Sequence, residues 1–279
     1  MARCMLWPGL IGVTTFYVFP FFLTLYYSVL HDPFEKQFVG LDNYRDLLQN
    51  AAFRLAVRNT VRFSALAVPL AVGLALGFAL ALERRIPGKS RFRTALLSPL
   101  MVPIASVVLI WEILFHQNGT VNRVLASLSV NGPDWLYSSW GILVIVLLFL
   151  WKNLGYNLVL FMAAISHIPP ETVEAARIDG AGAWRTFWCI KWRYLLSTTL
   201  FVSILTLANS FKVFREVYML SGNYPHEELY MLQHFMNNMF RTLNYPRLSA
   251  AMVLMTLVIG GVLAILFYFE GRSQNSVEE

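Results

Sequence analysis

The amino-acid sequence predicts an all-α protein that crosses a membrane six times. Apolar side chains make up 57% of its 279 residues and charged ones only 14%, whereas about a quarter of a soluble domain is charged. Disordered, collagen-like and disulfide-rich classes are excluded by the same composition. Each of six apolar runs is close to the ~20 residues that a helix needs to cross a bilayer. The runs cover residues 6–30, 63–82, 95–115, 141–165, 197–214 and 248–269.

The first two runs show why these segments are predicted as membrane spans. The apolar stretch of 6–30 exceeds that of a secretory signal, and no small-x-small cleavage site follows it, so a retained span is expected. The run 63–82 carries no charge and ends in Glu83-Arg84-Arg85, which marks the headgroup region. Prolines within the runs, such as Pro99 and Pro103 of the third, are tolerated in membrane helices because neighbouring groups satisfy the freed carbonyls.

The distribution of basic residues predicts that both termini lie in the cytosol. With that orientation the cytosolic segments carry eleven Lys and Arg residues and the opposite side nine. The short loop 83–94 alone holds five of them, and short loops follow the positive-inside rule. Outside the spans, clear helical content is predicted only for the cytosolic loop 166–196. The net charge of +6 does not indicate nucleic-acid binding, because no single basic face is formed.

Motifs for catalysis and metal binding are not supported. Pro87-Gly88-Lys89-Ser90 matches the end of a phosphate-binding loop, but Glu83 stands where that loop needs a glycine. Hydrolysis of ATP by this chain is therefore not expected. Two cysteines, Cys4 and Cys189, are too few for a disulfide framework or a thiol metal site. The five histidines show no metal-ligand spacing; they are His31, His116, His167, His226 and His234.

Polar residues within the fourth run are candidates for a solute path. Lys152 falls near the middle of 141–165, where a cation costs about 2.5–3.5 kcal/mol unless it has a partner or water. Helical spacing places Lys152 above Tyr156 and Asn153 above Asn157, beside Trp151. Amide groups and aromatic rings suit a sugar, which offers hydroxyls and an apolar ring face. Bonding between helices explains the same residues equally well.

The fifth run carries a second and weaker polar face. Asn209, Lys212 and Arg215 follow one another at intervals of three residues, and Glu112 of the third run is a candidate partner for one of the cations. Snorkelling of Arg215 and Glu112 to the interface is the alternative. The complete set of predicted path residues is Trp151, Lys152, Asn153, Tyr156, Asn157, Asn209 and Lys212.

The loop 166–196 reads as a short helix followed by a turn. Pro169 and Pro170 begin the helix, and its first turn holds an acidic residue. One side is expected to carry Val173, Ala176 and Ile178, and the following glycines permit the chain to reverse. Trp184, Phe187, Trp188 and Ile190 then lead back to the membrane. These residues suit a surface that another protein binds, or a loop that lies on lipid headgroups.

The cytosolic loop contains a motif made of Glu174-Ala175-Ala176, Gly180 and Ile190. The spacing of these residues resembles the EAA loop, a motif of the membrane subunits of binding-protein-dependent ABC importers. Within that family the chain resembles the carbohydrate-importing branch. Trp192-Arg193 departs from that pattern, which usually has Leu-Pro there. Further similarity to the branch extends along most of the chain, at residues 39–44, Asn59-Thr60, Pro99, Gly119, Asn122 and Ser249-Ala250-Ala251.

The resemblance implies a non-enzymatic permease subunit in a bacterial plasma (inner) membrane, with a coupling helix between the fourth and fifth spans. Expected partners are a second, related permease chain, two cytosolic ATPase subunits that bind ATP and Mg, and an extracytoplasmic solute-binding protein. A sugar or sugar derivative is the expected solute; sugar phosphates, amino acids and peptides are alternatives, and an intramembrane enzyme or sensor is a more distant one. The implied ATPase-coupling residues are Glu174, Ala175, Ala176, Asp179, Gly180 and Ile190.

Overall fold

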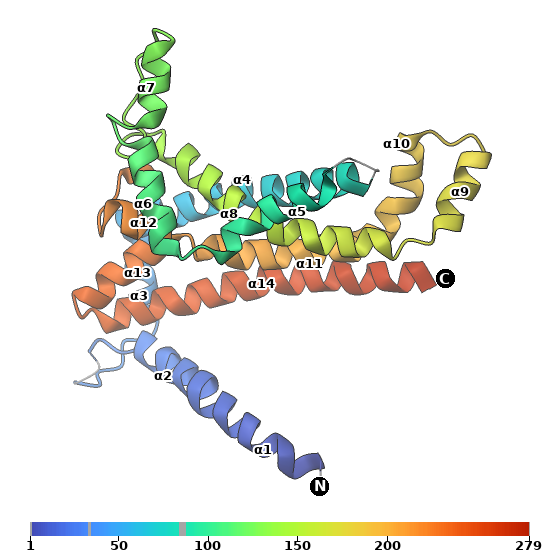
Figure 1. The fold of residues 1–279 in the computed structure, drawn as a ribbon. Helices are drawn as coiled ribbons and strands as arrows, with labels where there is room; N and C mark the ends of the chain where they lie inside the picture. Colours follow the sequence, from blue (N-terminus) through green and yellow to red (C-terminus); the bar gives the residue numbers. More distant parts are fainter. Residues whose placement is uncertain (1, 33–34, 84–87, 279) are drawn as a thin grey trace. The chain divides into compact units, whose positions relative to one another are not determined.

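The computed structural model describes residues 2–32, 35–83 and 88–278, and most of them lie in helices (Figure 1). These residues contain no strand beyond an isolated bridge between Leu30 and Phe38. Arg84, Arg85 and Pro87 of the predicted basic loop lie outside the described residues. The all-helical class is confirmed, with six segments long and apolar enough to cross a membrane. They are Leu6–Ser28, Ala51–Glu83, Ile104–Ser127, Gly141–Ser166, Ala183–Ser221 and Tyr245–Tyr268.

Internal contacts divide the chain into two units, and the first comprises residues 1–58 and 231–262. No residue in the most apolar stretch of its initial segment is buried within the chain, so this helix leaves most of its surface to lipid or to another subunit. The helices that begin in this unit are α1 (Ala2–Val13), η1 (Thr14–Val18), α2 (Phe19–Ser28), α3 (Asp42–Gln49), α4 (Ala51–Glu83), α13 (Leu232–Arg241) and α14 (Tyr245–Glu278).

The imidazole of His234 on α13 is buried. Its burial lowers the pKa to about 4, which keeps this imidazole neutral at pH 7.

Side-chain hydrogen bonds fix α3 against the end of α2. The Asn43 amide donates to the carbonyl oxygens of Ser28 and Leu30 at 2.9 and 2.7 Å, and it is buried. The Tyr44 hydroxyl lies 2.7 Å from that of Ser28. In this way α3 satisfies carbonyl groups that a helix end leaves without intrahelical partners.

The second unit comprises residues 59–230 and 263–279. Besides most of α4, it contains the helix α8 (Gly141–Ser166), and half of the residues in the most apolar stretch of α8 are buried. The remaining helices are α5 (Lys89–Leu97), η2 (Ser98–Met101), α6 (Ile104–Phe115), α7 (Thr120–Ser127), α9 (Pro170–Ile178), α10 (Ala183–Thr186), η3 (Phe187–Lys191), α11 (Trp192–Phe211), α12 (Phe214–Ser221) and η4 (Glu227–Leu229).

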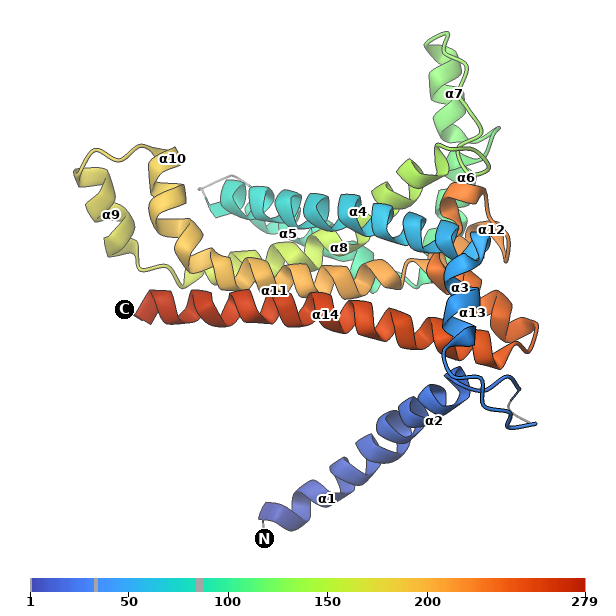
Figure 2. The same ribbon diagram turned by 180° about the vertical axis from the view of Figure 1, so that it is seen from behind.

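A common apolar core joins α4, α8 and α11, which run beside one another in this unit (Figure 2). Ala75 and Ala79 of α4 are fully or almost fully buried there, and their small side chains let helices approach closely. Phe161 of α8 and Leu195 of α11 fill the space between the backbones. The same core extends to Val173 on α9, so the loop after α8 is anchored to the bundle.

The third predicted span differs from the structure, because 95–115 is not one helix. The chain passes from α5 through the 3₁₀ turn η2 and resumes as α6 only at Ile104. Val102 is extended, with ψ of 128°, as expected for a residue that precedes proline. Pro99 and Pro103 therefore break the helix here, and the prediction that both would be accommodated within it was wrong.

Helices outside the spans are more numerous than predicted. The prediction limited clear extramembrane helical content to 166–196, whereas α3 and α13 lie elsewhere and α7 continues the third apolar segment beyond its predicted end at residue 115. Each is only eight to ten residues long. Short helices of this kind carry a polar face and are not apparent in a search for long apolar runs.

Candidate functional site

A cavity of about 360 Å³ lies beside the middle of α8, next to α11 and α12. Of the seven predicted path residues, five line it: Lys152, Asn153, Tyr156, Asn209 and Lys212. The two polar faces predicted on separate spans therefore meet at one site. The remaining lining residues are Leu100, Leu148, Phe149, Leu205, Val213, Arg215 and Glu216.

Lys152 and Glu216 form an ion pair at this cavity. The Nζ–Oε1 distance is 2.5 Å, and the two side chains are 33% and 3% exposed. A buried carboxylate in an apolar helix is costly unless a cation neutralises it, so each charge explains the presence of the other. Glu112, the predicted candidate partner for one of the cations, lines a different cavity.

Glu216 is the ionisable residue of this cavity that the sequence analysis did not identify. The fifth span was expected to end at residue 214, which placed Glu216 in an external loop. Instead α11 ends at Phe211 and a second helix, α12, begins at Phe214 within the same apolar segment. The signal that points to Glu216 is the unpaired cation predicted in the fourth span, because such a cation requires a partner.

Amide side chains connect α8 and α11 across the cavity. The Asn209 amide donates to Oδ1 of Asn153 at 3.1 Å, and the Asn153 amide donates to the carbonyl of Phe149 at 2.9 Å. Lys212 Nζ lies 3.5 Å from Asn209 Oδ1, the limit of a hydrogen bond. Asn209 is only half-buried, so it remains accessible from the cavity.

Asn157 and Trp151 lie outside this lining. Asn157 is buried and donates to the Thr206 hydroxyl at 3.0 Å, which is a bond between helices. Trp151 is 41% exposed and lies against Trp111, with ring centroids 6.3 Å apart. The predicted stripe is thus divided between residues that line the cavity and a residue that bonds a neighbouring helix.

The cavity carries an excess of positive charge. Lys152, Lys212 and Arg215 face one carboxylate, and Lys152 already neutralises that carboxylate. Lys212 and Arg215 are exposed and make no ion pair with a carboxylate of the described residues. An anionic group entering this cavity would meet two cations that are not neutralised.

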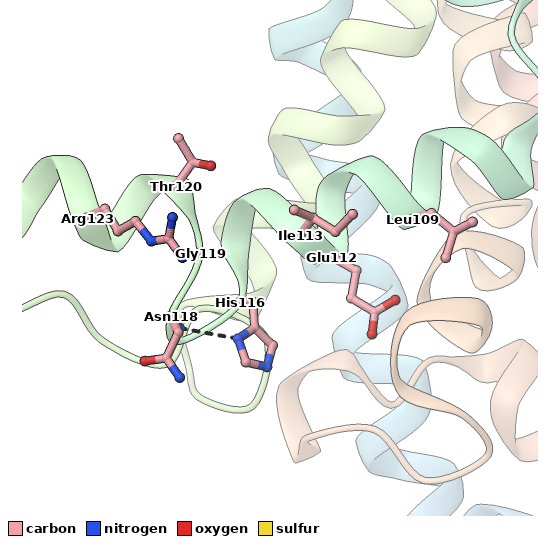
Figure 3. A pocket seen from close by; sticks show the side chains of 8 residues that line it. All are labelled: Leu109, Glu112, Ile113, His116, Asn118, Gly119, Thr120 and Arg123. Carbon is pink, nitrogen blue, oxygen red and sulfur yellow. Dashed lines mark hydrogen bonds between the residues drawn. The ribbon is translucent and has the colours of Figure 1, made fainter.

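A second cavity, of about 430 Å³, lies where α6 passes into α7. Figure 3 shows Glu112 and Arg123 on opposite sides of His116. His116 Nδ1 accepts a hydrogen bond from the Asn118 backbone N–H at 3.2 Å. The predicted path residues are absent from its lining, so this cavity is separate from the polar site on α8.

The EAA residues form an exposed helix and turn. Glu174, Ala175, Asp179 and Gly180 are exposed, whereas Ala176 and Ile190 are half-buried. Gly180 adopts φ of 78°, and the Ala181 N–H donates to the Ala176 carbonyl at 2.9 Å. This closes the end of α9 in the left-handed conformation that glycine adopts without strain.

Ile178 does not share a side with Val173, contrary to the prediction. Val173 packs against the apolar core, while Ile178 is 87% exposed. Five residues separate the two, which places them about 140° apart around a helix. Ile178 therefore lies on the exposed side of α9, away from the apolar core.

The chain enters α11 without the proline that the resemblance led us to expect. A π-helical turn, η3, connects α10 to α11 instead, and the helix continues through Trp192 and Arg193. Lys191 of this turn binds both carboxylate oxygens of Glu83, at 2.6 and 2.5 Å. The ion pair therefore joins the end of α4 to the segment that follows the EAA residues.

Comparison with known proteins places this arrangement in context. Residues 73–272 match the family described as binding-protein-dependent transport system inner membrane component. The chain is 32% identical to the sn-glycerol-3-phosphate transport system permease protein UgpA of Rhizobium meliloti (strain 1021), over 94% of this chain and 92% of that protein. It is 30% identical to the arabinooligosaccharides transport system permease protein AraP of Halalkalibacterium halodurans, over 66% of this chain and 59% of that protein.

Solved structures share the fold. A chain of a bacterial ABC transporter that imports the acidic polysaccharide alginate matches with a TM-score of 0.85, at 20% identity, over 97% of this chain and 95% of that one. The alginate transporter in complex with a periplasmic protein bound to an alginate pentasaccharide gives 0.84 at 21% identity, over 97% and 94%. The fold therefore has a counterpart among solved transporter chains.

Proposed function

The chain belongs to the family of binding-protein-dependent transport system inner membrane components, and from this we propose that it forms half of the path by which an ATP-driven importer carries a sugar or sugar derivative. The observation that carries the proposal is the cavity on α8, where amides and an ion pair lie within membrane-spanning helices. The chain itself is a multi-pass membrane protein and supplies no ATPase chemistry. Its proposed location is the bacterial inner membrane, with both termini in the cytosol.

Carbohydrate is the favoured solute class for two reasons. The relatives described above are named for glycerol phosphate and arabino-oligosaccharides, and the transporter of similar fold imports alginate. The cavity offers the amides of Asn153 and Asn209 and the phenol of Tyr156, which suit hydroxyl groups. Lys212 and Arg215 favour an anionic derivative, such as a sugar phosphate or a uronate, over a neutral sugar.

In the proposed assembly this subunit pairs with a second, related permease and binds two cytosolic ATPase subunits, while an extracytoplasmic binding protein delivers the solute. Helix α9 would dock on the ATPase, because its exposed surface combines Ile178 with charged residues of both signs. A protruding apolar side chain within a polar rim is typical of the centre of a protein interface. ATP and Mg would be bound by the ATPase subunits.

The proposal is tested by reconstituting the chain with its permease, ATPase and binding-protein partners in lipid vesicles. ATP-dependent uptake is measured with sn-glycerol 3-phosphate, an arabino-oligosaccharide and an alginate oligosaccharide as probes. Uptake of any of these that requires the binding protein supports a carbohydrate permease. If amino acids or peptides enter and these probes do not, the solute class is contradicted.

Gly180→Ala is expected to reduce coupled uptake about tenfold, because the left-handed conformation costs an L-residue about 1–2 kcal/mol and the end of α9 would reorient. Gly182→Ala is the matched control, since Gly182 has φ of −66° and a Cβ there would meet nothing within 4 Å. Uptake and ATP hydrolysis are measured together in vesicles. Equal uptake by the two variants would contradict the coupling role.

Asn209→Ala is expected to raise the KM for the transported solute about tenfold, the equivalent of losing ~1.4 kcal/mol of binding. The substitution removes the donor to Asn153 and one polar group of the cavity. Asn157→Ala serves as the comparison, because the Asn157 amide bonds the Thr206 hydroxyl between helices. This substitution should lower the amount of folded protein without changing the KM. The same KM in both variants would favour a purely structural role for the amides.

A further inference from the structure

Three tryptophans form a ladder on the segment that leads from the coupling helix into α11; two of them are exposed and the third, Trp192, is half-buried. Trp184, Trp188 and Trp192 follow one another at four-residue intervals, with ring centroids 5.7 and 5.4 Å apart. Trp184 is 76% exposed and Trp188 45% exposed. Such large exposed aromatic surfaces on one side of a helix indicate a contact that the isolated chain does not contain.

The ladder lies at the end of a candidate membrane-spanning helix. The helical segment Ala183–Ser221 has 39 residues, about twice the ~20 that a bilayer requires, so part of it lies outside the hydrocarbon core. At η3 the helix bends, and α10 turns away from the direction of α11 (Figures 1 and 2). A π-helical turn is a recognised cause of such a bend. If α11 crosses the bilayer, α10 runs along its surface.

The charges of this segment are of one sign. Residues 180–195 contain no Asp or Glu, and they contain Arg185, Lys191 and Arg193. Lys191 is neutralised by Glu83, whereas Arg185 and Arg193 are exposed on the same segment as the tryptophans. Tryptophan favours the level of the lipid headgroups, and arginine favours anionic headgroups.

We infer that the tryptophan ladder, with Arg185 and Arg193, seats α10 and η3 in the headgroup layer of a membrane containing anionic phospholipid. Lipid fits better than a protein partner because the surface adjoins a membrane span and carries cations but no acidic residue. The neighbouring helix α9, which has charges of both signs and the exposed Ile178, is left free for the ATPase. This lipid contact would hold α9 at a fixed distance from the membrane, so that displacement of α9 is passed to α11.

Cys189 is exposed between Arg185 and Arg193 and is a native position for a depth probe. A nitroxide is attached to it in the full-length Cys4→Ser chain, reconstituted in vesicles of phosphatidylethanolamine and phosphatidylglycerol. Collisions with oxygen, which partitions into lipid, and with a water-soluble nickel chelate are compared by electron paramagnetic resonance. The matched control carries the nitroxide at position 178 through Ile178→Cys in a Cys4→Ser, Cys189→Ser chain.

The Cys189 nitroxide should collide mainly with oxygen and the position-178 nitroxide mainly with nickel. Nickel access at both positions would overturn the inference, because α10 would then lie in water. Protection from both reagents at Cys189 would also overturn it, because the surface would then be covered by protein. These readouts need no transport, so they are independent of the solute and of the ATPase.

The role of the charges is tested with Arg185→Gln combined with Arg193→Gln. In the parent chain, replacing phosphatidylglycerol by phosphatidylcholine should raise nickel access at Cys189 by about twofold, because the anionic attraction is lost. The double variant should show the higher access in both lipids. Arg177→Gln, on α9, is the control and should behave as the parent. Indifference of the parent to lipid charge would contradict recognition of anionic lipid.

Discussion

Replacing Gly155 by Ala is expected to leave little folded protein in the membrane. A Cβ at this position would lie 1.9 Å from the backbone oxygen of Leu96 and 3.1 Å from the Cα of Leu97. Both are backbone atoms, so α8 and the end of α5 would have to move apart. Overpacking of this kind typically costs about 1–3 kcal/mol even where side chains can adjust, so a backbone clash should reach at least that range.

The matched control for this variant is Gly77→Ala on α4, where a Cβ would meet nothing within 4 Å. Alanine is favoured over glycine in a helix by about 1 kcal/mol, so this control should be neutral or slightly stabilising. The amount of full-length protein in membranes and its thermal stability in detergent are the two measurements. Normal levels of both for Gly155→Ala would show that the close approach of α5 and α8 is not required.

Lys152→Met is expected to destabilise the protein by about 3–5 kcal/mol, because it leaves a buried carboxylate without a counter-charge. Glu216 has a side chain that is only 3% exposed, so water cannot replace the lost ammonium group. The converse change, Glu216→Gln, should be milder, since the Lys152 side chain is 33% exposed to the cavity. The measurement is the apparent melting temperature of the purified chain in detergent.

A double variant separates the cost of the unpaired charge from general damage at the site. Lys152→Met combined with Glu216→Leu removes both charges, and replacement of a buried ion pair by apolar residues is often tolerated. The double variant should therefore be more stable than Lys152→Met alone, although it has two substitutions. If the double variant instead loses as much stability as the two single substitutions added together, the ion pair is not the reason why the protein is sensitive to substitution of Lys152.

The membrane-spanning segments could be predicted because the bilayer imposes a length and a composition that appear directly in the sequence. Each predicted run overlaps a helical segment of the structure. The break of the third run could not be predicted with the same rule. Pro99 and Pro103 are both compatible with a membrane helix when neighbours satisfy the freed carbonyls, and only the packing shows that the chain bends here.

The candidate site was predicted in part. Lys152 and Asn209 were recognised because a polar group in an apolar run requires an explanation, and both line the cavity. Glu216 was missed because its position depends on the short turn at Lys212 and Val213 between α11 and α12. Helical periodicity predicts neighbours within one helix, whereas contacts between helices depend on how the connecting turn is made.

Two positions of the family resemblance have structural explanations. The Asn59 amide donates to the carbonyls of Glu227 and Tyr230 at 2.6 and 3.0 Å, which ties α4 to the chain around η4. Asn122 accepts a hydrogen bond from the Trp135 indole at 2.6 Å and donates to the carbonyls of Gln117 and Pro133. Both side chains satisfy loop backbone groups, so a pattern that suggests function also contains residues whose role is to shape loops.

The π-helical turn Phe187–Lys191 also has a consequence for helical phase. One residue more or fewer in a helix rotates everything beyond it by about 100°. Removing a single residue from this turn would point Trp184 and the attached α9 toward a different side of the bundle while leaving the buried face of α11 unchanged. Insertions and deletions at this turn would thus be a simple means of re-orienting α9, the helix proposed to dock on the ATPase, toward partner surfaces of different shape.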